Sequence, residues 1–161
     1  MIKTLMNHGS YRVDYFNLDG TATPDALALY VCGELDLTKR YSSTVKNQLY
    51  SGLLLVKMHL GLSNLLAVYV DVNDSGSLQR PAYQKLKEDI RAGYFKRIFV
   101  YQISDLIGSA VVAEDWDRFN QEISEIELLT YDQKACQMLR HGSQNVHWVN
   151  HIHCFVGCVC Q

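Results

Sequence analysis

Basic side chains gather in one segment near the middle of this 161-residue chain, between residues 80 and 97. They are Arg80, Lys85, Lys87, Arg91, Lys96 and Arg97, and Glu88 and Asp89 oppose them. Cationic groups bind phosphate oxygens, so the segment predicts weak contact with a nucleic-acid backbone through Arg80, Lys85 and Arg91. A solvated helix face explains the same charges and stays open as the alternative.

The segment that follows carries the opposite charge. Between residues 104 and 132, eight acidic residues stand against one basic residue, Arg118. Such a surface repels DNA and suits a protein partner instead.

Potential metal ligands gather near the C-terminus. Three histidines and three cysteines fall within fourteen residues: His147, His151, His153, Cys154, Cys158 and Cys160. Imidazole and thiolate groups are the ligands that zinc prefers, so a zinc-binding interaction module is one hypothesis. The spacing matches no standard zinc finger. An apolar tail that packs on the sheet, or a tail produced by a reading-frame change in a decaying gene, accounts for the same residues.

The elements that position these side chains follow an alternating order. Apolar runs at residues 26–31, 65–71, 97–103 and 126–131 predict strands, and helical patterns separate them. This alternation predicts an α/β fold, with a mostly parallel sheet and helices on both faces.

Three helices are expected between these strands. Thr44 is a candidate N-cap for the first, and Gly61 can end it. Pro81 suits the first turn of the second helix, which Gly93 can stop. Ser109 can cap a third helix with an apolar stripe.

The chain divides into three parts in this interpretation. Residues 1–25 form an N-terminal extension, which is either an added edge strand or a loosely attached arm. Residues 26–131 form one α/β domain, and residues 132–161 form a divergent tail that contains the histidines and cysteines.

The loop, helix and strand over residues 74–101 resemble the middle of a serine recombinase catalytic domain, of the resolvase, invertase and large serine integrase family. The resemblance covers residues 26–131 and implies a resolvase-like fold of mobile-element or phage origin. The family cleaves and rejoins DNA at specific sites through a phosphoserine intermediate. Arg80 stands where the family has an arginine that helps to hold the scissile phosphate.

Most other catalytic positions of the family are changed. The family opens with a tyrosine, any residue, an arginine, a small residue and the nucleophilic serine, whereas this chain reads Tyr30-Val31-Cys32-Gly33-Glu34. An aspartate and two arginines that follow the third strand become Ser104, Asp105 and Gly108. Gln48 resembles a glutamine at this distance in the large-integrase branch.

These changes remove the chemistry that the resemblance implies. A carboxylate at Glu34 cannot attack a phosphodiester as a serine does. Each lost charge-stabilising donor lowers the rate by about a hundredfold to a thousandfold, so three missing arginines suppress turnover. One alternative keeps cleavage through a displaced nucleophile, Ser42 or Ser43. Helix-entry residues with exposed hydroxyls are the other interpretation of these two serines.

Bulk properties narrow the function further. The formal net charge of −2 gives no overall attraction to nucleic acid, so we expect weak or no DNA binding by the chain alone. No apolar run reaches the length of a membrane span, and we expect a cytoplasmic protein without a cofactor. The favoured hypothesis is a catalytically degenerate recombinase-like domain that regulates DNA recombination through contact with itself or with an active recombinase.

Overall fold

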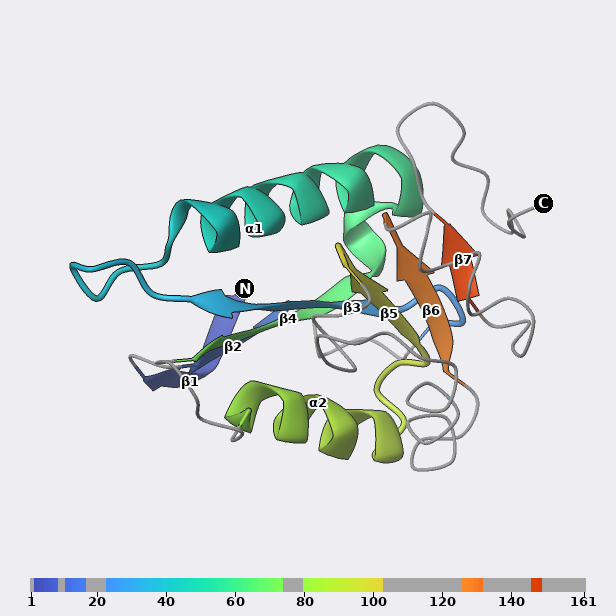
Figure 1. Cartoon of the computed structure of the whole chain (residues 1–161). Coiled ribbons are helices and arrows are strands. Elements are labelled where there is room, and N and C mark those ends of the chain that lie inside the picture. The colour runs from blue at the N-terminus through green and yellow to red at the C-terminus, as the bar shows by residue number, and fades with distance from the viewer. Residues whose placement is uncertain are drawn as a thin grey trace.

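The computed structural model describes residues 2–8, 11–16, 23–73, 80–102, 126–131 and 146–148. These residues form a seven-stranded sheet with the order β1-β2-β4-β3-β5-β6-β7 (Figure 1). The strands are β1 Ile2–His8, β2 Tyr11–Phe16, β3 Leu27–Glu34, β4 Leu65–Asn73, β5 Arg97–Val100, β6 Glu127–Thr130 and β7 Val146–Trp148.

The sheet is mixed and mostly parallel. Strands β4, β3, β5, β6 and β7 run parallel to one another, while β1 and β2 are antiparallel additions beside β4. The predicted α/β class with a mostly parallel sheet is therefore confirmed.

Two helices cover opposite faces of the sheet (Figure 1). Helix α1 spans Ser43–Leu55 and continues as a π-helical turn, Val56–Leu60, which ends at Gly61. Helix α2 spans Pro81–Arg91. Both predicted stops are glycines at positive φ, 83° at Gly61 and 82° at Gly93, where a residue with a side chain would be strained.

Each face of the sheet has its own apolar core. On one face, Ala82, Leu86 and Ile90 of α2 pack with Tyr30 and Tyr69 of the sheet. On the other face, α1 packs with residues of β3, β4 and β5. Gly52 allows α1 to lie close to the sheet, because a Cβ atom there would be only 3.0 Å from Leu29 Cδ1. The sheet thus separates two apolar cores, one beneath each helix.

Two local predictions are wrong. The N-cap of α1 is Ser42 and not Thr44, because the Ser42 side chain accepts the hydrogen bond from the Val45 amide. The strand expected over residues 97–103 is shorter, since β5 ends at Val100 where its pairing with β3 ends. The helix expected after Ser109 lies outside the described residues.

The N-terminal extension contributes strands to this sheet. Strand β2 pairs with β4 from Tyr11↔Asp71 to Tyr15↔Ala67, and β1 pairs with β2. Of the two interpretations of residues 1–25, the added strand is closer to the structure than the loose arm, but two strands are added and β1 lies at the edge of the sheet. The division of the chain into three parts stays a prediction.

No helix within the described ranges is both long enough and apolar enough to cross a membrane.

Candidate functional site

A buried carboxylate occupies the N-terminus of α2. Asp71, near the end of β4, is fully buried. Its Oδ1 accepts the Ala82 amide at 2.9 Å, and its Oδ2 accepts the Tyr83 amide at 2.8 Å and the Tyr30 hydroxyl at 3.0 Å. The first amides of a helix carry partial positive charge and commonly bind anions. Here an acidic side chain of the chain itself occupies that position.

Arg80 lies beside this carboxylate, immediately before α2. Its guanidinium carbon is 3.9 Å from the centre of the Tyr83 ring. Burial raises the pKa of Asp71 above its ordinary value, while the two amides, Tyr30 and the charge of Arg80 oppose the rise. Burial also raises the pKa of Tyr30, and the negative charge of Asp71 adds to the effect. Tyr30, Asp71 and Arg80 therefore form one electrostatic cluster.

The other residues singled out by the resemblance fall in different places. Cys32 is half-buried and packs against the same apolar core as Tyr30. Glu34 ends β3 and is exposed. Gln48 lies on α1, across the sheet from Arg80. Ser104, Asp105 and Gly108 lie outside the described residues.

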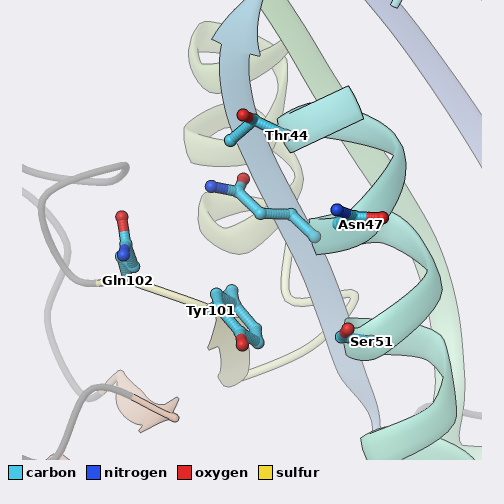
Figure 2. Close-up of a pocket in the computed structure, with 6 residues that line it drawn as sticks. Thr44, Asn47, Ser51, Tyr101 and Gln102 are labelled. Atoms are coloured by element: carbon cyan, nitrogen blue, oxygen red, sulfur yellow. The ribbon is translucent and has the colours of Figure 1, made fainter. Parts of the chain in front are cut away.

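A small polar pocket lies on the α1 face. It has a volume of about 190 Å³, and its lining residues are Thr44, Asn47, Gln48, Ser51, Tyr101 and Gln102. Figure 2 shows Thr44, Asn47 and Ser51 on α1, with Tyr101 and Gln102 across from them. Gln48 is only 6% exposed, and its Oε1 accepts no hydrogen bond within the described structure.

The pocket lies at the point where the sheet changes its direction of winding. From β3 the chain passes over α1 to β4 on one side, whereas β5 pairs with β3 on the other side. The parallel strands thus follow the order second, first, third, fourth, fifth. Sheets of this kind bind ligands at the carboxyl ends of the strands that flank the change of direction. Tyr101 and Gln102 directly follow one of these strands, β5.

The candidate displaced nucleophiles begin α1. The Ser42 hydroxyl accepts the Val45 amide at 3.3 Å, which is a helix-capping role. Ser43 is exposed at the first helical position. Both serines thus have the positions that the helix-entry interpretation expects.

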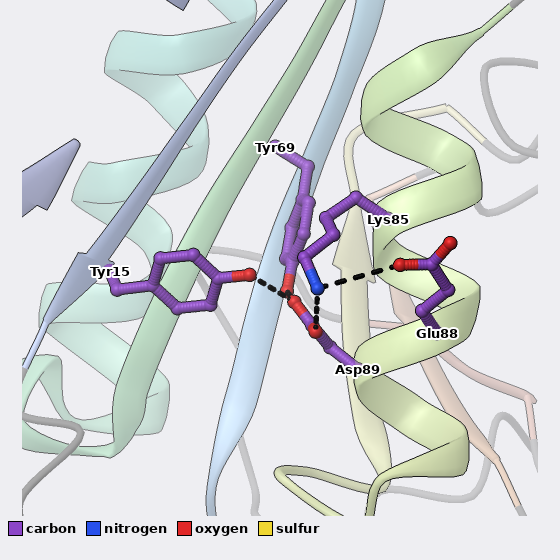
Figure 3. A network of polar contacts seen from close by, with 5 residues as sticks. All are labelled: Tyr15, Tyr69, Lys85, Glu88 and Asp89. Carbon is purple, nitrogen blue, oxygen red and sulfur yellow. Dashed lines mark hydrogen bonds and ion pairs between the residues drawn. The ribbon is translucent and has the colours of Figure 1, made fainter. Parts of the chain in front are cut away.

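Lys85 belongs to a different polar network, shown in Figure 3. Its ammonium group lies 2.8 Å from Oδ1 of Asp89 and 3.5 Å from Glu88. Asp89, only 1% exposed, also accepts the hydroxyls of Tyr15 and Tyr69. The hydrogen bond to Asp89 raises the pKa of Lys85. This network joins α2 to strands β2 and β4.

A different lysine shares the side of α2 with Arg80. Seven residues make almost two helical turns, so Arg80 and Lys87 lie on one side, and Arg91 follows one turn later. The Lys87 ammonium is 4.9 Å from the centre of the same Tyr83 ring that Arg80 covers. Arg97, which the sequence placed in the basic segment, is 5% exposed and pairs with Glu127 at 3.2 Å.

The possible metal ligands fall mostly outside the described structure. His147 lies in β7, and His151, His153, Cys154, Cys158 and Cys160 lie beyond it in undescribed residues. In the described ranges, no group of three or more His, Cys, Asp or Glu side chains could hold a metal ion. The zinc module stays a prediction.

Comparison of the chain with protein-family models, curated proteins and solved structures gave no match.

The sequence analysis did not predict the two buried carboxylates or the polar pocket, although the sequence contains a signal for each. Asp71 and Asp89 are acidic residues at otherwise apolar positions, one in a strand and one on the inner side of a helix. Thr44, Asn47, Gln48 and Ser51 follow the spacing i, i+3, i+4 and i+7, which places four polar side chains on one flank of a helix. Only the packing of β5 beside that flank makes it a pocket.

Proposed function

We propose that this chain is a non-cleaving relative of the serine recombinases, of mobile-element or phage origin. It acts in the cytoplasm on DNA recombination, by contact with an active recombinase or with a second copy of itself. Its own contact with DNA is weak and runs through the basic side of α2. A resolvase-like version of the α/β fold is part of this proposal.

The filled anion position at the start of α2 carries the proposal. The resemblance implies that Arg80 helps to hold a scissile phosphate at this end of the sheet. In this chain the Asp71 carboxylate already accepts two helix amides and the Tyr30 hydroxyl there. A phosphate would have to displace a buried group with three hydrogen bonds and overcome its negative charge.

The changed residues support the same conclusion. Cys32 and Glu34 stand where the family has an arginine and the nucleophile, and Glu34 adds negative charge at the end of β3. The hydroxyl of Ser42, one displaced candidate, accepts a backbone amide. Loss of the nucleophile together with an internally filled phosphate position favours interaction over strand cleavage.

Weak DNA contact is best assigned to one side of α2. Arg80, Lys87 and Arg91 share that side, whereas Lys85 is paired with the buried Asp89. Cationic side chains along a helix bind the phosphate backbone without reading sequence, and such binding falls steeply with salt.

The test is a recombination assay with a purified serine integrase and its own attachment-site DNA, with and without the full chain. We expect the yield of recombinant DNA to change in proportion to the amount of chain added. An unchanged yield at a large molar excess would overturn the proposal. A suicide substrate in the same assay detects cleavage, and a covalent adduct that Ser42→Ala or Ser43→Ala abolishes would replace the proposal by the displaced-serine alternative.

Two variants separate DNA contact from protein contact in this assay. The triple variant Arg80→Gln, Lys87→Gln and Arg91→Gln removes the basic side of α2. A control variant, Lys46→Gln with Lys57→Gln, removes two exposed charges from the α1 side. An effect that survives the triple variant runs through protein contact, and an effect that only the triple variant removes runs through DNA.

A further inference from the structure

We propose that the pocket between α1 and the end of β5 binds a nucleobase, either as a free nucleoside or as an unpaired base in a single strand. The proposal does not rest on the relation to serine recombinases. It rests on the pocket's unpaired buried acceptor, the chemistry of its lining, its size and its place in the sheet.

The buried acceptor is the starting observation. Gln48 is 94% buried, as its 6% exposure shows, and it lines the pocket. Its Oε1 atom is itself covered and accepts no hydrogen bond within the described structure. Buried polar atoms in folded proteins nearly always have a partner, and leaving one without a partner is destabilising. When the carboxamide turns so that Oε1 faces the pocket, a donor on the ligand satisfies this atom.

The lining residues determine the class of ligand. Three of the six described lining side chains are carboxamides, two are hydroxyls and one is a tyrosine, and none of these six is charged. Such a lining does not favour phosphate or carboxylate groups. A carboxamide presents a donor and an acceptor in one plane, which matches the adjacent donors and acceptors on the edge of a base.

The aromatic wall is held in place. The Tyr101 ring stacks on Tyr131 with 5.0 Å between ring centres and 16° between ring planes. Unpaired bases are commonly bound by aromatic side chains together with hydrogen bonds to their edges. A fixed aromatic ring beside three carboxamides reproduces that combination of groups.

The volume restricts the ligand to about one ring system. The pocket measures about 190 Å³, below the roughly 300–1,000 Å³ of sites that hold drug-sized molecules. A pyrimidine base fits this scale better than a dinucleotide or a peptide.

The first experiment is a titration of the full chain, labelled with nitrogen-15, with thymidine, cytidine, uridine and adenosine. We expect the side-chain amide signal of Gln48 to shift, with a dissociation constant of about 0.1–1 mM for the best nucleoside. A short single-stranded oligonucleotide and its duplex are tested in parallel. Binding of nucleosides identifies a free nucleoside as the ligand. Binding of the single strand alone identifies a base within a strand, and both results support the proposal.

Gln48→Met is the decisive variant, because methionine keeps the length of the side chain but removes both polar atoms. Binding should weaken at least tenfold, while the midpoint of thermal unfolding stays the same or rises, since Oε1 has no partner to lose. Gln84→Met makes the same change at an exposed position of α2, across the sheet, and should leave binding unchanged. Asn47→Ala, at an exposed lining residue, should weaken binding severalfold without repacking the core.

Four results would overturn the proposal. They are no shift with any nucleoside or single strand, binding of monosaccharides in place of nucleosides, binding that survives both Gln48→Met and Asn47→Ala, and binding that Gln84→Met removes equally well.

Discussion

Near the carboxyl ends of the parallel strands, the two faces of the sheet differ in whether a buried polar group has hydrogen-bond partners. On the α2 face, Asp71 accepts three hydrogen bonds and lies beside Arg80. On the α1 face, Gln48 is almost as deeply buried, yet its Oε1 accepts none within the described residues. A satisfied buried group stabilises the fold, whereas an unsatisfied one is a place where a ligand can add stability. The comparison favours a structural role for the buried Asp71 carboxylate and supports the binding role proposed for the pocket.

Asp71→Ala should have the largest effect on stability. It leaves the Ala82 and Tyr83 amides and the Tyr30 hydroxyl without their acceptor in a buried site. We expect the free energy of unfolding to fall by about 3–5 kcal/mol, measured by urea denaturation. Asp71→Asn keeps one oxygen acceptor, so the free energy of unfolding should fall by less in this variant. If Asp71→Ala and the wild type have the same midpoint of urea denaturation, the Asp71 carboxylate does not stabilise the α2 face.

Asp89→Asn tests whether the second carboxylate on the α2 face is structural in the same way. It removes the charge that pairs with Lys85 at Oδ1 and leaves a single oxygen acceptor, whereas both the Tyr15 and the Tyr69 hydroxyl donate to Oδ2 in the wild type. We expect a loss of about 2–3 kcal/mol in urea denaturation. Tyr15→Phe and Tyr69→Phe each remove a single donor and should lose about 1 kcal/mol. If Asp89→Asn loses no more stability than either tyrosine variant, Asp89 is not the common partner of Lys85, Tyr15 and Tyr69.

Much of this fold could be predicted because its signals are local. The apolar run that forms β4, the proline that opens α2 and the two glycines that end helices depend on neighbours in the sequence. The N-cap of α1 could not be chosen from neighbouring residues in this way, since Ser42, Ser43 and Thr44 are all suitable N-cap residues. The Ser42 amide donates to the Glu34 carbonyl at 3.2 Å, and this contact with the end of β3 helps to fix where the helix begins.

The candidate site was predictable only in part, because its partners come from distant segments. Arg80 was placed correctly before a helix, but the acceptor beside it comes from β4. The spacing of four residues along α2 is enough to pair Lys85 with Asp89. The burial of Asp89, in contrast, depends on Tyr15 of β2 and Tyr69 of β4, which come from distant segments. The pocket needed the position of β5 beside α1, which the spacing of polar residues along one helix cannot give.

The pH dependence of stability sharpens the comparison, because Asp71 on the α2 face carries a titratable carboxyl group and the pocket residue Gln48 does not. The pKa of Asp71 is raised by burial above its ordinary value of 3.8, so the folded protein holds this proton more tightly than the unfolded chain does. The contribution is therefore fully present below pH 3.8 and is lost as the pH rises through the folded-state pKa.

Subtraction of the Asp71→Asn curve from the wild-type curve isolates this group. Other titrating groups largely cancel in the difference, so the stability of the wild type relative to the variant should decrease with rising pH just above 3.8. The Gln48→Met curve should instead run parallel to the wild-type curve. A difference that increases with pH would mean that the amides of α2 and Arg80 outweigh burial at Asp71.

The smallest expected effect is at the start of α1. Ser42→Ala removes the side-chain oxygen that accepts the Val45 amide and should lower the free energy of unfolding by about 1 kcal/mol in urea denaturation. Ser42→Asp keeps an acceptor at the helix N-terminus and should retain most of that stability, whereas Ser43→Ala, at an exposed position, should change little. Equal losses from Ser42→Ala and Ser43→Ala would contradict the capping role. Because the cap fixes the first turn of α1, which carries Thr44, Ser42→Ala should also weaken ligand binding slightly, and Ser42→Asp should restore it.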